Sequence, residues 1–297
     1  MKFLLILLIV FGLFFSACSN NPFIKDDNPQ DIIAGSGLKV NFDVDDEWVP
    51  EISYELELVG DGKEIIVLKR EEVILSTSSK KQDGSIVFTE DTVDKFYEEL
   101  FEEGELELAY GQKKTFKGVL EIDDEFYQNL NAESFEYSLN IPYEYKTVLE
   151  NNVVLNLKEK TLTYDKDGQA APVQITDIEL YPRSKDDYRI LYYVKDKGQT
   201  SGKVSVKIDE FQFKFGAEDI SDSCKVHKDD EGKTPINMDN IKLSKAQEVL
   251  IFSCVLPIDN YPLDSVNTDT SGYLKYVYTG LFDGKIDLPD SRVKAFE

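Results

Sequence analysis

The segment Phe135-Glu-Tyr-Ser-Leu-Asn-Ile141 decides the fold class, because its apolar and polar residues alternate without interruption. A period of two places the apolar side chains on one face of an extended chain and is typical of a half-buried β-strand. The same alternation occurs at Leu38–Val44 and at Ile52–Val59. The sequence therefore predicts an all-β protein.

Shorter segments of the first half of the chain carry the same pattern, separated by Gly- and Asp-rich turn residues such as Gly60-Asp61-Gly62. They predict strands at 64–68, 72–75, 85–88, 105–110, 115–122, 143–147 and 153–157. Because these strands are short and the turn signals are frequent, we expect antiparallel β-sandwiches rather than an α/β sheet.

One segment follows a helical period instead. Its apolar residues fall at i, i+3, i+4, i+7 and i+8, at Val93, Phe96, Tyr97, Leu100 and Phe101. This spacing predicts one short amphipathic helix in the first half. We expect its apolar face to pack against a sheet; docking of a partner is the alternative.

The alternation lapses between Thr163 and Pro172 and restarts at Val173. In the second half it predicts strands at 173–180, 188–195, 203–215, 249–256, 273–279 and 281–287. At roughly 100 to 200 residues per domain, 297 residues suit two domains. We therefore expect a first β-sandwich domain at 37–163 and a second at 172–288.

The charge of the chain excludes two classes of protein. With 33 Lys and Arg against 57 Asp and Glu, the formal net charge is −24. A strongly acidic surface repels nucleic-acid phosphates and anionic lipid headgroups. Nucleic-acid binding and docking to a membrane through a basic patch are therefore not expected.

The first 18 residues have the form of an export signal. Lys2 precedes the apolar run Phe3–Phe15, and small residues precede Cys18, which predicts a signal peptide at 1–17. Phe15-Ser16-Ala17-Cys18 resembles the lipobox of bacterial lipoproteins, with Phe in place of the usual Leu. That resemblance implies a lipid on Cys18, while a plain secretory signal or an uncleaved anchor remain alternatives.

Residues 18–36 follow as a polar segment with Asn and Pro residues, which predicts a flexible tether between the lipidated Cys18 and the folded chain. If Cys18 carries lipid, Cys224 and Cys254 remain as an even pair in an oxidising compartment, where a disulfide is expected. The alternative is a zinc site made from Cys224, His227 and Cys254, which lacks a fourth ligand.

Carboxylates offer the other candidate sites. Asp43, Asp45, Asp46 and Glu47 form an oxygen-rich run that suits calcium, or alternatively a charged turn. Acidic clusters at 45–47, 123–125 and 229–231 supply the paired carboxylates that a hydrolase needs, but without an apolar wall to separate their pKa values. His227 lies in an acidic loop and is not expected to be catalytic.

Tyrosines recur at even spacing in two predicted strands of the second half. Tyr188 shares a strand face with Tyr192, and Tyr276 shares one with Tyr278. Such pairs either form a contact surface or fill the interior of a sandwich.

The whole layout looks like that of bacterial lipid-anchored surface proteins with tandem immunoglobulin-like domains, a family that implies no catalytic residues. We therefore expect a non-enzymatic binding or structural module in the cell envelope. Its partners would be the membrane, through the N-terminal lipid, and a protein or glycan at the surface, and it needs no cofactor unless calcium binds. An envelope hydrolase and a transporter's solute-binding lipoprotein are the alternatives, the latter disfavoured by the scarcity of predicted helix.

Overall fold

The computed structural model describes residues 37–47, 49–81, 84–101, 104–129, 133–165, 169, 171–184, 188–198, 203–228, 241–243, 248–262 and 264–288. All of them belong to one compact unit, Ala34–Glu297. The predicted signal peptide at 1–17, Cys18 and the tether at 18–36 lie outside the described residues, as do the acidic residues 229–231.

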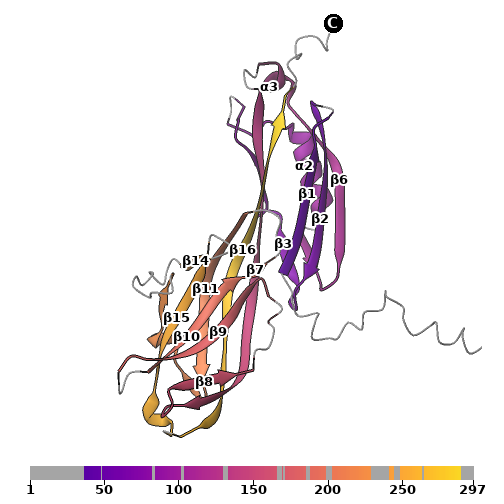
Figure 1. Cartoon of the computed structure of the whole chain (residues 1–297). Coiled ribbons are helices and arrows are strands. Elements are labelled where there is room, and N and C mark those ends of the chain that lie inside the picture. The colour runs from indigo at the N-terminus through magenta and orange to yellow at the C-terminus, as the bar shows by residue number, and fades with distance from the viewer. Residues whose placement is uncertain are drawn as a thin grey trace, which may run out of the picture. The chain divides into compact units, whose positions relative to one another are not determined.

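The described chain is mostly β, as predicted, and its sheets are antiparallel (Figure 1). The strands are β1 (Gly37–Asp45), β2 (Glu51–Asp61), β3 (Ile66–Lys69), β4 (Ile74–Thr77), β5 (Glu105–Leu108), β6 (Lys113–Glu121), β7 (Ser134–Asn156), β8 (Thr161–Tyr164), β9 (Val173–Pro182), β10 (Tyr188–Asp196), β11 (Lys203–Phe215), β12 (Glu218–Asp219), β13 (Lys225–His227), β14 (Ile241–Leu243), β15 (Val249–Leu256) and β16 (Val266–Asp287).

Two strands are far longer than the sequence predicts. β7 has 23 residues and β16 has 22, and they pair continuously from Val266↔Leu155 to Asp287↔Ser134. The predicted strands at 135–141, 143–147 and 153–157 are thus one strand, and so are those at 273–279 and 281–287. Pro142 does not interrupt β7, because the pairing of β4 with β7 ends at Asn140 and leaves that edge open. We call this pair of strands the ribbon.

The ribbon is the centre of one seven-stranded sheet and pairs with different strands along its length. Near its Ser134 end, β7 pairs with β4; farther along, β16 pairs with β11 and β7 pairs with β8. Separate sheets are formed by β1, β2 and β6 and by β13, β15, β10 and β9, and β3 pairs with β5. Strand pairing therefore crosses the predicted boundary at 163–172, and the division into two domains there stays a prediction.

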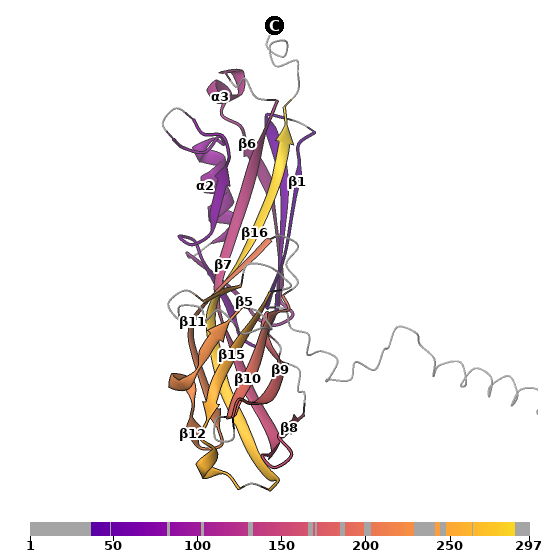
Figure 2. The same cartoon turned by 60° about the vertical axis from the view of Figure 1, so that its left-hand side comes forward.

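The sheet of β13, β15, β10 and β9 and the part of the seven-stranded sheet around β11 form two layers (Figure 2). Tyr192 of β10 stacks on Phe213 of β11 with ring centroids 4.2 Å apart, and Phe252 of β15 meets Phe213 edge-on at 5.4 Å. Because β10 and β15 belong to one sheet and β11 to the other, these rings form the core between the two sheets.

The predicted helix is confirmed as α2 (Glu90–Leu100). Its apolar face packs inward, as expected: Phe96 contacts Tyr54 of β2 at 5.2 Å between ring centroids. On the same helix, the Tyr97 hydroxyl accepts a hydrogen bond from Leu75 N of β4 at 3.0 Å. The helix therefore contacts both the sheet of β1, β2 and β6 and strand β4, which pairs with the ribbon.

The prediction of a single helix was wrong. A second one, α3 (Asp124–Asn129), follows Asp123, where the sequence indicates only a turn. Asp123 Oδ1 accepts the Phe126 N–H at 3.1 Å, as an N-cap residue does, and Asp124 and Glu125 favour the first turn electrostatically. The predicted strand at 85–88 was also wrong: that segment makes only isolated bridges, Lys80↔Ile86 and Phe88↔Ile122.

Four buried tyrosines occupy the middle of the ribbon on one face, and we call them the tyrosine cluster. Tyr143 pairs with Tyr278 across the two strands, and Tyr145 pairs with Tyr276. All four are buried, and burial raises the pKa of Tyr143 and of Tyr276, so the hydroxyls stay neutral. For Tyr276 and Tyr278 the structure thus confirms core filling, and Tyr188 and Tyr192 are buried as well.

Each hydroxyl of the cluster reaches a different segment of the chain. Tyr143 accepts from Leu38 N at 3.2 Å, Tyr145 from Glu64 N at 3.4 Å and Tyr276 from Val173 N at 3.2 Å, while Tyr278 donates to Asp196 Oδ1 at 3.2 Å. These bonds tie the start of β1, the β2–β3 connection, the start of β9 and the end of β10 to the ribbon.

Two glycines make room for these contacts. A Cβ on Gly198 would lie 2.1 Å from the Tyr278 hydroxyl, and one on Gly62 would lie 2.2 Å from the Tyr145 hydroxyl. Any side chain at either position would therefore displace the tyrosine. Glycine here serves the close approach of the backbone to the cluster.

We predict that Tyr276→Phe lowers the free energy of unfolding by about 1–3 kcal/mol, because the Val173 N–H loses its acceptor in a buried position. Tyr181→Phe is the matched control, since Tyr181 is exposed on β9. Urea denaturation of the two variants measures the difference. Equal stability of both variants would contradict a structural role for the cluster.

Candidate functional site

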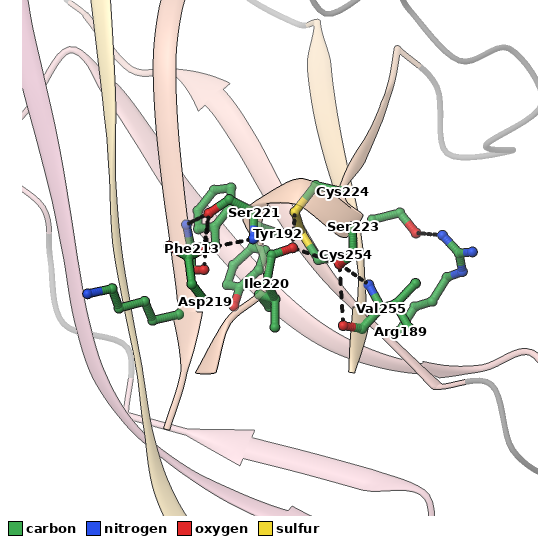
Figure 3. Close-up of a disulfide and its surroundings, with 12 residues drawn as sticks. Arg189, Tyr192, Phe213, Asp219, Ile220, Ser221, Ser223, Cys224, Cys254 and Val255 are labelled. Carbon is green, nitrogen blue, oxygen red and sulfur yellow. Dashed lines mark hydrogen bonds between the residues drawn. A yellow bond between two sulfur atoms is a disulfide. The ribbon is translucent and has the colours of Figure 1, made fainter. Parts of the chain in front are cut away.

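The predicted disulfide is present in the structure. Cys224 and Cys254 are bonded, and both are buried (Figure 3). Cys254 lies in β15, and Cys224 lies directly before β13, whose first residue, Lys225, pairs with Ser253. The bond therefore joins the edge strand β13 to its neighbour across 30 residues of sequence.

Hydrogen bonds surround the disulfide and link it to both sheets. The Ser223 hydroxyl accepts from Val255 N at 2.9 Å and donates to Ile220 O at 2.6 Å. Two residues earlier, Ser221 Oγ accepts from Phe213 N of β11 at 2.8 Å (Figure 3). The short 3₁₀ helix Ser221–Ser223 thus connects the β13–β15 edge to the opposite sheet.

The zinc alternative for these residues loses its ligands, because the two thiolates are consumed in the disulfide. His227 lies in β13, partly buried and paired with Ile251 of β15, and its lack of a catalytic role stays a prediction. In the described ranges, no three His, Cys, Asp or Glu side chains converge to hold a metal ion.

The calcium candidates lie at the end of β1. Asp45 Oδ1 accepts the Glu47 N–H at 3.0 Å, and Asp46 Oδ2 accepts the Asp287 N–H of β16 at 3.2 Å. Asp43 accepts from the Asn41 amide at 2.8 Å. These carboxylates therefore already serve backbone and amide donors. Calcium binding stays a prediction, which melting temperatures in calcium and in chelator would test.

Asp43 also lines the groove that we consider the candidate functional site. The groove has a volume of about 520 Å³ and lies between β1, the start of β11 and the β7–β16 ribbon. Its lining residues are Asn41, Phe42, Asp43, Tyr137, Lys203, Phe282 and Asp283. We call it the seam groove.

The charged and aromatic side chains of the seam groove contact one another across strands. Lys203 of β11 and Asp283 of β16 form an ion pair at 3.0 Å. Phe42 of β1 meets Tyr137 of β7 edge-on, with ring centroids 5.9 Å apart. Burial, followed by the charges of Asp46, Asp43 and Asp283, raises the pKa of Tyr137, so its hydroxyl stays protonated and can donate.

A second, smaller groove of about 320 Å³ lies beside α2 and contains three carboxylates, Glu51, Glu99 and Glu121. Glu51 and Glu121 are directly opposed on β2 and β6, and Tyr54 donates to Glu99 Oε2 at 3.3 Å. All three carboxylates are exposed to solvent. In glycoside hydrolysis the general acid is a carboxyl group in an apolar surrounding, which an exposed carboxylate lacks.

Of the acidic clusters chosen from the sequence, 45–47 and 123–125 are among the described residues. Asp123 caps α3 and pairs with Lys81 at 3.4 Å, whereas Asp45 accepts from Glu47 N and Asp46 from Asp287 N. The residues of the seam groove were missed, because they come from four separate strands and no spacing in the sequence connects them. Only Asp43 belongs to both sets.

Reduction of Cys224–Cys254 should destabilise the protein, because the bond closes a loop of 30 residues. In the chain-entropy model such a loop contributes about 3–4 kcal/mol, less any native strain. The Cys18→Ser variant has only these two cysteines, so thiol labelling after denaturation without reductant should find no free thiol. Two labelled thiols per chain would refute the bond.

Comparisons with known proteins assign no family and no function to this site. A scan against protein-family models found no match, and no curated protein matched the chain. In the part of the chain that the structure describes, no helix is long and apolar enough to cross a membrane.

Proposed function

We propose that this protein is a non-enzymatic binding module of the cell envelope, exported by its signal peptide and held at the membrane by lipid on Cys18. Its strands would form two immunoglobulin-like sandwiches, and its partner would be a protein or glycan at the cell surface. The layout resembles that of bacterial lipid-anchored surface proteins with tandem immunoglobulin-like domains.

The disulfide is the observation that carries this proposal. Structural disulfides are typical of exported proteins, because thiols in the cytosol are kept reduced. Cys224 and Cys254 are both buried and bonded to each other, which leaves Cys18 as the odd cysteine of the chain. An unpaired cysteine directly after a predicted signal peptide fits lipidation.

The surface chemistry supports binding over catalysis. The carboxylates beside α2 are exposed to solvent, whereas the seam groove combines rings with hydrogen-bonding groups. Rings that can pack on a ligand, beside polar groups that can fix its orientation, suit a binding site. The envelope hydrolase therefore has less support than the module.

We predict that Cys18→Ser moves the protein out of the membrane fraction. A doubly acylated N-terminus gives stable membrane residence, while the remaining chain is acidic and has no affinity for anionic lipid. Fractionation measures the membrane-bound share of wild type, of Cys18→Ser and of the control Ser19→Ala. Mass spectrometry of the mature N-terminus shows whether it is acylated. Lipid anchoring would be refuted if Cys18→Ser stayed in the membrane fraction at the wild-type level and the wild-type N-terminus carried no acyl mass.

A further inference from the structure

The proposed function does not say which class of ligand the seam groove binds. Three structural elements contribute: residues 41–43 of β1, Lys203 at the start of β11, and the ribbon with Tyr137, Phe282 and Asp283. Its volume of about 520 Å³ falls within the roughly 300–1,000 Å³ of small-molecule sites.

Hydrogen-bonding groups of both kinds line the groove. Asp43 and Asp283 accept, Lys203 donates, and the Asn41 amide does both. A ligand with many hydroxyls, each a donor and an acceptor, matches such a mixture. A purely apolar ligand would remove these groups from water without bonding their remaining donor and acceptor positions, which costs free energy.

The charges of the groove disfavour the two kinds of ion. An anion would face Asp43 and Asp283 with one lysine to offset them, and Asp46 lies close enough to act on Tyr137. A cation would have to displace Lys203 from Asp283 and the Asn41 amide from Asp43. A neutral polar ligand can bond the remaining donor and acceptor positions and leave both pairs in place.

Tyr137 supplies a ring fixed in place. It pairs with Gly284 across the ribbon, and a Cβ on Gly284 would lie 2.3 Å from the Tyr137 hydroxyl, so the ring lies against bare backbone. Phe42 abuts it from β1. A ring that is already ordered loses little conformational entropy when a ligand packs on it. The apolar C–H face of a sugar ring packs on aromatic side chains in this way.

We infer that the seam groove binds a neutral oligosaccharide, with Tyr137 as the stacking platform and Asn41, Asp43, Lys203 and Asp283 as partners of its hydroxyls. This inference rests on the proposed function and names its ligand class. In the envelope it would make the module a glycan-binding one.

The test is calorimetric titration of the full mature chain, in a detergent without sugar headgroups, with cellotetraose, maltotetraose and tetra-N-acetylchitotetraose. A tetrasaccharide of hexuronic acid serves as the charged comparison. We expect at least one neutral tetrasaccharide to bind and to bind more tightly than the charged one. Tyr137→Ala should weaken that binding at least about tenfold, while Tyr137→Phe keeps the ring and most of the affinity.

Tyr181→Ala is the matched control, because Tyr181 is an exposed tyrosine of β9 outside the groove, and it should leave binding unchanged. Thermal melts confirm that each variant is folded. The inference is overturned if no neutral tetrasaccharide binds, if the charged one binds more tightly, or if Tyr137→Ala binds as well as Tyr181→Ala.

The two proposals fail separately. If wild type is acylated and resides in the membrane but binds none of these saccharides, the ligand class is wrong and the anchored module stands. If the chain binds a neutral tetrasaccharide through Tyr137 but carries no lipid, the anchor is wrong and the groove assignment stands.

Discussion

The continuous pairing of β7 with β16 is the constraint on which the rest of the structure depends. Twenty-two residues of β16 are in register with β7, and strands from both halves of the sequence pair with this ribbon. The tyrosine cluster at its middle adds four hydrogen bonds to four separate segments. A one-residue slip of either strand would turn that strand's two tyrosines to the opposite face and break their bonds.

The seam groove and the disulfide are both connected to the ribbon. Tyr137 and Asp283 of the seam groove belong to it, while Lys203 begins the strand that pairs with it. At the far side of the adjoining sandwich, the disulfide fixes the β13–β15 edge, and Ser221 connects that edge to β11. The seam groove thus depends on the register of the ribbon directly, and the disulfide edge reaches the ribbon's sheet through Ser221 and β11.

Alternation of apolar and polar residues was enough to predict the fold class, most strands and α2, because these depend on which face of a local segment is buried. The disulfide was predictable from the cysteine count together with the predicted signal peptide. The merging of 135–141 with 143–147 was not, since Pro142 indicates an interruption unless the open edge is known. The seam groove was equally hidden, because Asn41, Tyr137, Lys203 and Asp283 meet only through tertiary packing.

Native-state hydrogen exchange of the ribbon tests the central claim most directly. The account predicts that amides of Ile141–Thr147 and Leu274–Gly280 exchange only through global unfolding, with the same free energy as the slowest amides of β2 and of β10. It would be contradicted if β2 and β10 exchanged with different free energies, or if the centre of the ribbon exchanged faster than either.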